Sequence, residues 1–409
     1  LGRYGTTELA AIGLADAVYA VCLFLTLGIV DGIQITIARR AGQGREREIG
    51  AVFGQGLYLL AAVSLVFVIV LKTVAPGLVR TLIGSAAIAE AVDSYLQIFA
   101  FAMLFHGVNL ALSAFYVGVS RTRALIGATV VLAAVNVFLD YVLIFGNLGF
   151  PELGIRGAAI GSLSAEIAAF AFLVIHVVLR GYHRRYGLFA FARWNRSLSE
   201  RLMVLSYPVA LDALVETVRW FAFFLIIESL GETALASANI VFGCYALMLI
   251  PIHGFSETTC SMVSNLVGQE QDSQIGALVR RAVSLGYAVV LPLALLSFLF
   301  PAVALSLFTT DPEILATSVA SLRIVALGFL FLIPGDILFN AVVGTGDTAA
   351  TLVIEVLSTI CVLGLASAFV FAFELPLASV WVAEVAGVVT LLAFSGLWLR
   401  SGRWARLTV

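Results

Sequence analysis

Residues 5–51 read GTTELAAIGLADAVYAVCLFLTLGIVDGIQITIARRAGQGREREIGA, and residues 231–277 read GETALASANIVFGCYALMLIPIHGFSETTCSMVSNLVGQEQDSQIGA. The two stretches align without a gap at an offset of 226 residues, as between Leu9 and Leu235. Further identities in the same register are Tyr19 with Tyr245, Gly28 with Gly254, Gly42 with Gly268, Ile49 with Ile275, Gly118 with Gly344 and Thr122 with Thr348. Two copies of one pattern in register predict a duplicated fold.

The composition around this repeat is that of a membrane protein. Of the 409 residues, 61% are hydrophobic and 12% are charged, and the mean hydropathy is +1.07. Soluble domains are about 45–50% apolar and about 25% charged. Since lipid accepts apolar side chains without cost, we expect an all-α polytopic membrane protein.

Apolar runs of membrane-spanning length recur along the whole chain. Short polar loops separate them, except for one long polar connection at 180–201. Eleven spans are predicted: 8–37, 49–72, 91–118, 124–146, 157–180, 202–229, 233–258, 275–300, 313–343, 349–373 and 377–399.

The basic residues predict the orientation. Seventeen of the 23 lie in loops on one side, four lie on the other side, and Arg219 and Arg323 fall inside spans. Because cytoplasmic loops carry the excess of Lys and Arg, Val409 is expected in the cytoplasm of a multi-pass inner-membrane protein.

The repeat also predicts the domains. The partner of the span at 202–229 would end near Leu1, so one further helix is expected before this chain, giving two pseudo-symmetric six-helix lobes. The expected division is 1–180 for the first lobe, 181–201 for a cytoplasmic linker and 202–409 for the second lobe. Transporters built from such repeats bind substrate near mid-membrane.

Several ordered motifs resemble the multidrug and toxic compound extrusion (MATE) family. They are GRYGTTELAAIGLA at 2–15, ARRAGQG at 38–44, NVFLDYVLIFG at 136–146, GFPELGIRGAAIGS at 149–162, LGETALA at 230–236 and GTGDT at 344–348. The resemblance implies two lobes arranged as a V. It also implies export of organic, often cationic, compounds in exchange for Na⁺ or H⁺.

Asn136 and Asp140 are four residues apart and share one helix face. An amide oxygen and a carboxylate can bind Na⁺, or the carboxylate can carry a proton; a packing hydrogen bond is the alternative. The family resemblance places its cation site here and adds a hydroxyl that falls at Ser162, where the family usually has Thr. A family Asp of the first helix lies outside this chain.

In the second half, Asp212, Glu216 and Arg219 share one helix face. Either Arg219 neutralises the acids, or Glu216 binds a proton or a cationic substrate, as the resemblance implies. Asp336 and Asn340 repeat the four-residue spacing and are a further coupling or lumen candidate.

His106 and Asn109 also share a face, for helix packing or for lining a lumen. Glu355 and Glu384 are isolated acids that suit polar packing or a proton relay. Glu166 carries no assigned role.

These patterns favour an ion-coupled antiporter, expected as a monomer in the bilayer. A flippase for lipid-linked oligosaccharide precursors is the alternative, although such proteins are expected to carry more intramembrane Arg and Lys. An enzyme is disfavoured because the four histidines are scattered and HExxH, GxSxG and P-loop motifs are absent. Nothing in the sequence suggests a resident metal, a cofactor beyond the coupling ion, or nucleic-acid binding.

Overall fold

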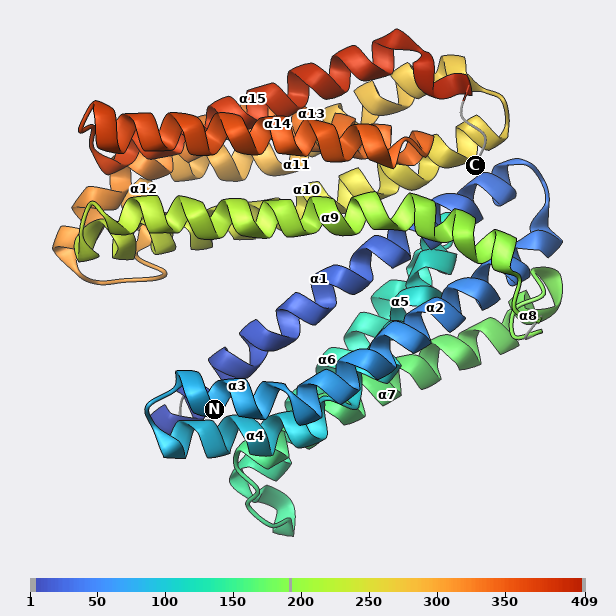
Figure 1. Ribbon diagram of the computed structural model, residues 1–409, viewed down its shortest axis with the longest axis horizontal. Helices are drawn as coiled ribbons and strands as arrows, with labels where there is room; N and C mark the ends of the chain where they lie inside the picture. Colours follow the sequence, from blue (N-terminus) through green and yellow to red (C-terminus); the bar gives the residue numbers. More distant parts are fainter. Residues whose placement is uncertain (1–4, 191–192, 407–409) are drawn as a thin grey trace. The chain divides into compact units, whose positions relative to one another are not determined.

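The computed structural model describes residues 5–190 and 193–406, and within these ranges the chain forms helices and no strands (Figure 1). Eight helices of the described chain are long and apolar enough to cross a membrane, or nine if one bent pair counts as a single span. The predicted class, an all-α polytopic membrane protein, is confirmed.

The first compact unit runs from Leu1 to Ala210. Its long helices pack as α1 on α2 and α5, α5 on α7, and α6 on α7. The elements are α1 (Thr6–Gly42), α2 (Glu46–Thr73), α3 (Ala75–Leu82), α4 (Ala86–Phe99), α5 (Ala102–Gly118), α6 (Arg123–Phe145), η1 (Asn147–Gly149), α7 (Ile155–Leu179), α8 (Tyr182–Arg185) and the start of α9 (Arg196–Glu228).

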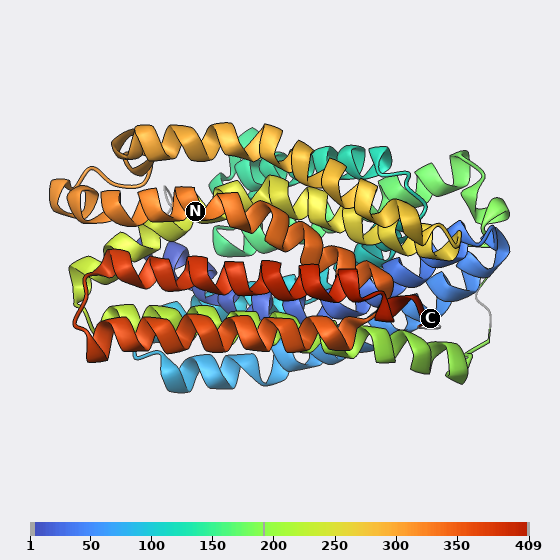
Figure 2. The same ribbon diagram turned by 90° about the horizontal axis from the view of Figure 1, so that it is seen from above.

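The second unit runs from Leu211 to Val409. Helices α14 and α15 lie side by side in both views (Figures 1 and 2). After α9, the elements are α10 (Glu232–Gly268), η2 (Asp272–Gln274), α11 (Ile275–Leu299), α12 (Pro301–Leu305), α13 (Pro312–Thr345), α14 (Thr348–Ser367), the π-helical turn η3 (Ala368–Ala372), α15 (Leu377–Ser401) and η4 (Arg403–Arg406).

The helix plan of the two units is duplicated. Helix α10 begins and ends 226 residues after α1, the offset found in the sequence. The pairings correspond as well: α1 with α5 and α10 with α13, α2 with α5 and α11 with α13, α5 with α7 and α13 with α15, and α6 with α7 and α14 with α15. The predicted pseudo-symmetry is therefore present in the internal packing of each unit.

Small residues bring the paired helices close together. A Cβ at Gly157 of α7 would overlap the Leu143 carbonyl of α6, and a Cβ at Gly344 of α13 would overlap the Cys260 carbonyl of α10. Helices in lipid gain stability from such close packing, because lipid and side chains are equally apolar. The α6–α7 contact matters for function, since it holds the first group of polar residues described below.

The structure differs from the predicted spans at 91–118, where α4 and α5 meet at a bend of 49°. Backbone hydrogen bonds there reach back three residues, from Phe101 to Ile98 and from Met103 to Ala100. Such bonds tighten the chain into a turn. No proline or glycine lies in 98–104, so the sequence carries no local signal for the break.

The segment predicted as a linker, 181–201, is packed against the first unit. Tyr186 and Leu188 are buried in that unit's core. The side chain of Gln55 on α2 donates to the Arg193 carbonyl and accepts from the Asn195 amide. The division between the two units falls at 210–211, inside α9, whereas the predicted second lobe begins at 202.

Helix α9 contributes to both cores, and this is the physical reason for the later boundary. Leu198 and Leu202 pack in the first core, while Phe223 and Ile227 pack in the second.

Candidate functional site

The predicted residues Asn136 and Ser162 meet between α6 and α7. The Asn136 side-chain amide donates to the Ser162 hydroxyl at 3.3 Å. One turn further along α6, Asp140 faces the backbone of Gly161, where an added Cβ would overlap the Asp140 Oδ1 atom. The helix spacing thus places all three predicted side chains on the α6–α7 interface.

The Asp140 carboxylate is half-buried. Its Oδ1 atom is buried and has no hydrogen-bond partner among the described residues. Nearby on α6, Val137 is 69% exposed and Tyr141 is 55% exposed, as expected for side chains that face lipid. The carboxylate therefore points toward α7, and an incompletely satisfied acid in this position is available to bind a cation.

A second polar group in the first unit joins α5 to α7. His106 Nδ1 lies 2.9 Å from Glu166 Oε1, and the Asn109 amide donates to Glu166 Oε2 at 2.7 Å and to the Glu166 carbonyl at 3.1 Å. Glu166 thus brings together His106 and Asn109, which the sequence had placed only on a common face.

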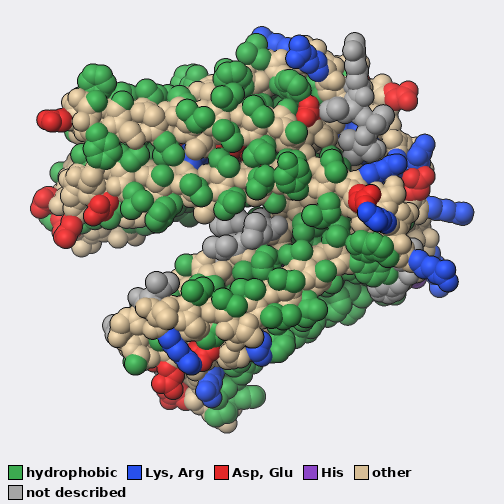
Figure 3. Space-filling view, in the orientation of Figure 1, with side chains coloured by type: hydrophobic (Ala, Val, Ile, Leu, Met, Phe, Trp, Pro, Cys, Tyr) green, Lys and Arg blue, Asp and Glu red, His purple; other side chains and the backbone are tan. Residues whose placement is uncertain are grey.

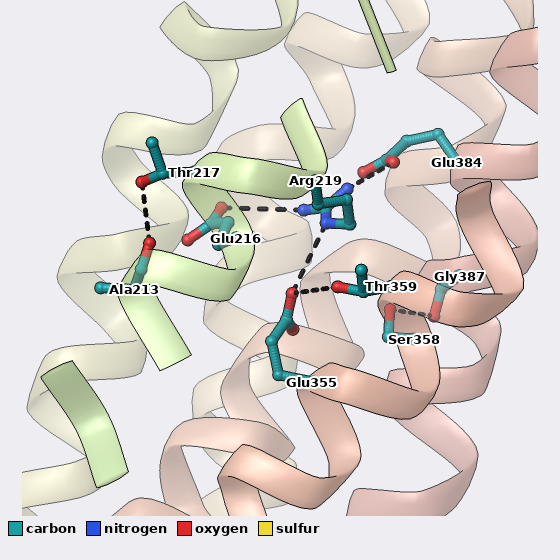
Figure 4. Close-up of polar contacts among 9 residues, drawn as sticks. All are labelled: Ala213, Glu216, Thr217, Arg219, Glu355, Ser358, Thr359, Glu384 and Gly387. Atoms are coloured by element: carbon teal, nitrogen blue, oxygen red, sulfur yellow. Dashed lines mark hydrogen bonds and ion pairs between the residues drawn. The ribbon is translucent and has the colours of Figure 1, made fainter. Parts of the chain in front are cut away.

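In the second unit, Arg219 lies among three carboxylates (Figure 4). Its guanidinium is 2.6 Å from Glu384 of α15, 3.5 Å from Glu355 of α14 and 3.8 Å from Glu216 of α9 itself. Arg219, Glu355 and Glu384 are at most 7% exposed, whereas the Glu216 side chain is 54% exposed. The guanidinium also lies over the Trp220 ring at 4.9 Å.

The remaining predicted residues lie nearby in the same unit. Asp336 on α13 accepts a hydrogen bond of 2.5 Å from Ser256 on α10. Asn340 donates to the Asp336 carbonyl, one turn back on its own helix, at 3.1 Å. Asp212 is half-buried on α9, one turn before Glu216.

Sequence reasoning missed four partners: Glu166, Ser256, Glu355 and Glu384. Only Glu166 had a local signal, because it follows Ser162 by one helical turn and so shares its face. Glu384 lies 165 residues beyond Arg219 along the chain, and no helix periodicity reports a contact of that range.

The surface fits a bilayer. Hydrophobic side chains cover the flanks of the helices in each unit, and charged side chains gather near helix ends (Figure 3). The polar groups described above lie between helices, and this is where ionisable groups of transporters are found.

The chain resembles known transporters over nearly its whole length. A family model, MatE, matches residues 1–142 and 208–370. A probable multidrug resistance protein NorM from Thermotoga maritima is 26% identical, covering 100% of this chain and 88% of the relative. Another from Aromatoleum aromaticum is 27% identical, covering 96% and 86%.

Solved structures share the fold. A MOP superfamily transporter from Pyrococcus furiosus, described as having a binding pocket of reverse polarity, superimposes with a TM-score of 0.90 at 20% identity, covering 100% of this chain and 90% of that one. A MATE crystal structure in the bent conformation gives a TM-score of 0.88 at 21% identity, covering 97% and 88%.

Proposed function

The chain belongs to the MatE family of membrane transporters, and from this premise we propose that it is a secondary active antiporter that exports organic cations in exchange for H⁺ or Na⁺. The observation that carries the proposal is the Asp140 carboxylate, held between α6 and α7 with a buried oxygen that no described donor satisfies. The multidrug resistance assigned by name to the NorM relatives supports the substrate class.

Asp140 is proposed as the coupling acid because its charge is costly in the membrane. A carboxylate between helices is stabilised when it takes up a cation, and it then loses its net charge. Asn136 and Ser162 hold a polar contact one turn away and would orient the ion. Binding that favours one helix arrangement over another shifts the population between conformations, as alternating access requires.

In the second unit, Glu216 is the carboxylate proposed to contact a cationic substrate. It is more than half exposed and lies farther from Arg219 than Glu355 or Glu384 does. Asp336 remains a second proposed coupling acid, and its bond from Ser256 would hold the carboxylate in place. The loop arginines support a cytoplasmic C-terminus in a cell membrane.

A flippase for lipid-linked oligosaccharide precursors is the competing function. A pyrophosphate headgroup needs cationic side chains that are free to bind it. The buried Arg219 guanidinium is committed to three carboxylates, which disfavours that role in the second unit.

The test is ethidium transport in proteoliposomes under a pH gradient and a Na⁺ gradient imposed separately. Wild-type protein should transport under at least one gradient, and Asp140→Asn should lose gradient-driven transport while eluting as an intact monodisperse protein. Asp272→Asn, in the exposed turn η2, is the matched control. Gradient-driven transport by Asp140→Asn with unchanged ion dependence would refute the proposal.

A further inference from the structure

We propose that His106, Asn109 and Glu166 form a proton-binding site, so that the coupling ion of the first unit is H⁺. The inference rests on the proposed antiport function and deepens it by naming the ion. It also gives a role to Glu166, which the sequence left without one.

The geometry occupies both oxygens of the Glu166 carboxylate. Oε1 faces His106 Nδ1 at 2.9 Å, and Oε2 accepts from the Asn109 amide at 2.7 Å. The Asn109 amide also reaches the Glu166 carbonyl at 3.1 Å, so its orientation is set by two acceptors. As a result, Asn109 Oδ1 points into a buried space where no described donor meets it.

Such an arrangement suits a proton better than Na⁺. Sodium needs several oxygen ligands that turn their lone pairs toward it. Here N–H donors approach the carboxylate instead, and their positive hydrogens would repel a metal ion. A proton needs only one of these atoms, and the imidazole and the carboxylate share it across the 2.9 Å contact.

The proton balance of the cluster is simple. With a neutral imidazole and an ionised Glu166, the three side chains carry a charge of −1. Taking up one proton brings the charge to zero, either as an imidazolium beside the carboxylate or as a carboxylic acid that donates to the imidazole. Among the described residues, none with a positive charge forms an ion pair with Glu166 other than His106, and His106 Nε2 is buried without a partner.

The neighbouring helices bring few other titratable groups to this cluster. From α1, Tyr19 meets the His106 ring edge-on, with centroids 6.3 Å apart. From α6, Asp140 lies across α7, against Gly161. Helix α2 packs Ser64 against Gly107, next to His106. Asp140 is thus the other acid whose charge affects the cluster within the described part of the unit.

The cluster is also connected to the proposed coupling acid through α7. Ser162 and Glu166 lie one turn apart on this helix, and Asn136 and Asp140 lie one turn apart on α6. The Asn136–Ser162 hydrogen bond joins the two helices at the same level. Two carboxylates on one helix interface interact electrostatically, so protonation of one favours ionisation of the other.

The experiment counts protons released when ethidium binds. Purified protein in detergent and weak buffer is mixed with saturating ethidium while a pH dye reports released protons. Wild type should release protons. Glu166→Gln and His106→Gln, which preserve polar side chains of similar size, should each release fewer per bound ethidium. Glu152→Gln, in the exposed loop before α7, should release the wild-type number.

Thermal unfolding of each variant shows whether it is folded, so a loss of proton release is read only from folded protein. In proteoliposomes, the same two variants should lose transport driven by a pH gradient. Two results would overturn the inference: wild-type proton release by both variants, or ethidium transport by wild type that only a Na⁺ gradient drives.

The result also separates this inference from the antiport proposal. If wild type transports under a gradient and Asp140→Asn does not, antiport stands whatever Glu166 does. If neither gradient drives ethidium in wild type, antiport itself fails.

Discussion

The two units place their acids in different electrostatic settings on the same helix plan. In the first unit, Asp140 and Glu166 lie near amide, hydroxyl and imidazole groups. In the second, Glu355 and Glu384 surround the guanidinium of Arg219, which is permanently charged. Duplication has therefore preserved the helix packing but not the charge balance.

One pair of positions illustrates the difference. Ser162 is the eighth residue of α7, and Glu384 is the eighth residue of its counterpart α15. The first makes a neutral hydrogen bond to α6, while the second makes a buried ion pair to α9. An acid with a built-in counter-ion needs no external cation, whereas one without it does. We therefore expect ion exchange in the first unit and a structural role for Arg219 with Glu355 and Glu384.

The largest expected effect tests the structural role of Arg219. Arg219→Met leaves two buried carboxylates without their cation and should destabilise the protein by about 3–5 kcal/mol. Thermal unfolding in detergent, followed by tryptophan fluorescence, measures the loss. The triple variant Arg219→Met/Glu355→Gln/Glu384→Gln should regain most of it, and the exposed Arg281→Met should be neutral. Wild-type stability of Arg219→Met alone would remove the distinction between the units.

A smaller effect is expected from crowding the first site. Gly161→Ala places a methyl group against the Asp140 carboxylate, and such overpacking costs about 1–3 kcal/mol. It should also displace the acid and reduce gradient-driven ethidium transport. Gly364→Ala in α14 is the matched variant, since a Cβ there meets no atom within 4 Å. That change should be neutral or stabilising by up to about 1 kcal/mol. Equal behaviour of the two variants would contradict the close α6–α7 contact at Asp140.

Two serines compare the two helix pairs directly. Ser358 donates to the Gly387 carbonyl at 3.0 Å in a buried contact of α14 with α15, and Ser358→Ala should cost about 1 kcal/mol. Its transport should keep the wild-type ion dependence. Ser162→Ala, by contrast, should change the ion dependence of ethidium transport with a smaller loss of stability, because the Ser162 contact is longer and only half-buried. If Ser358→Ala alters ion dependence and Ser162→Ala does not, the assignment of roles is reversed.

The smallest effect on stability is expected for Glu216→Gln. This acid is 54% exposed and 3.8 Å from Arg219, so its removal should change stability by less than about 1 kcal/mol. Ethidium affinity should fall, since the proposed substrate contact is lost, and equilibrium binding measures it. Glu384→Gln should show the opposite balance, with a clear loss of stability. Equal unfolding temperatures for these two variants would mean that burial does not separate the acids around Arg219.

The sequence by itself determined the membrane class, most of the span positions, the duplication at 226 residues and the shared faces of Asn136 with Asp140 and of Glu216 with Arg219. All of these follow from short-range periodicity or composition, because a helix repeats every 3.6 residues and a bilayer requires spans of similar length. The α1 and α10 bounds show how exact this information was.

Only the tertiary structure decided which helices bring their polar groups together. Glu166 meets His106 across 60 residues of sequence, and Glu384 meets Arg219 across 165. The bend between α4 and α5 likewise lacks a local signal. Contacts of this kind depend on how apolar helices pack against one another, and a run of Leu, Val and Ala in one span fits several neighbours equally well. The sequence therefore supplied the titratable groups, and the helix packing decided which of them share charge.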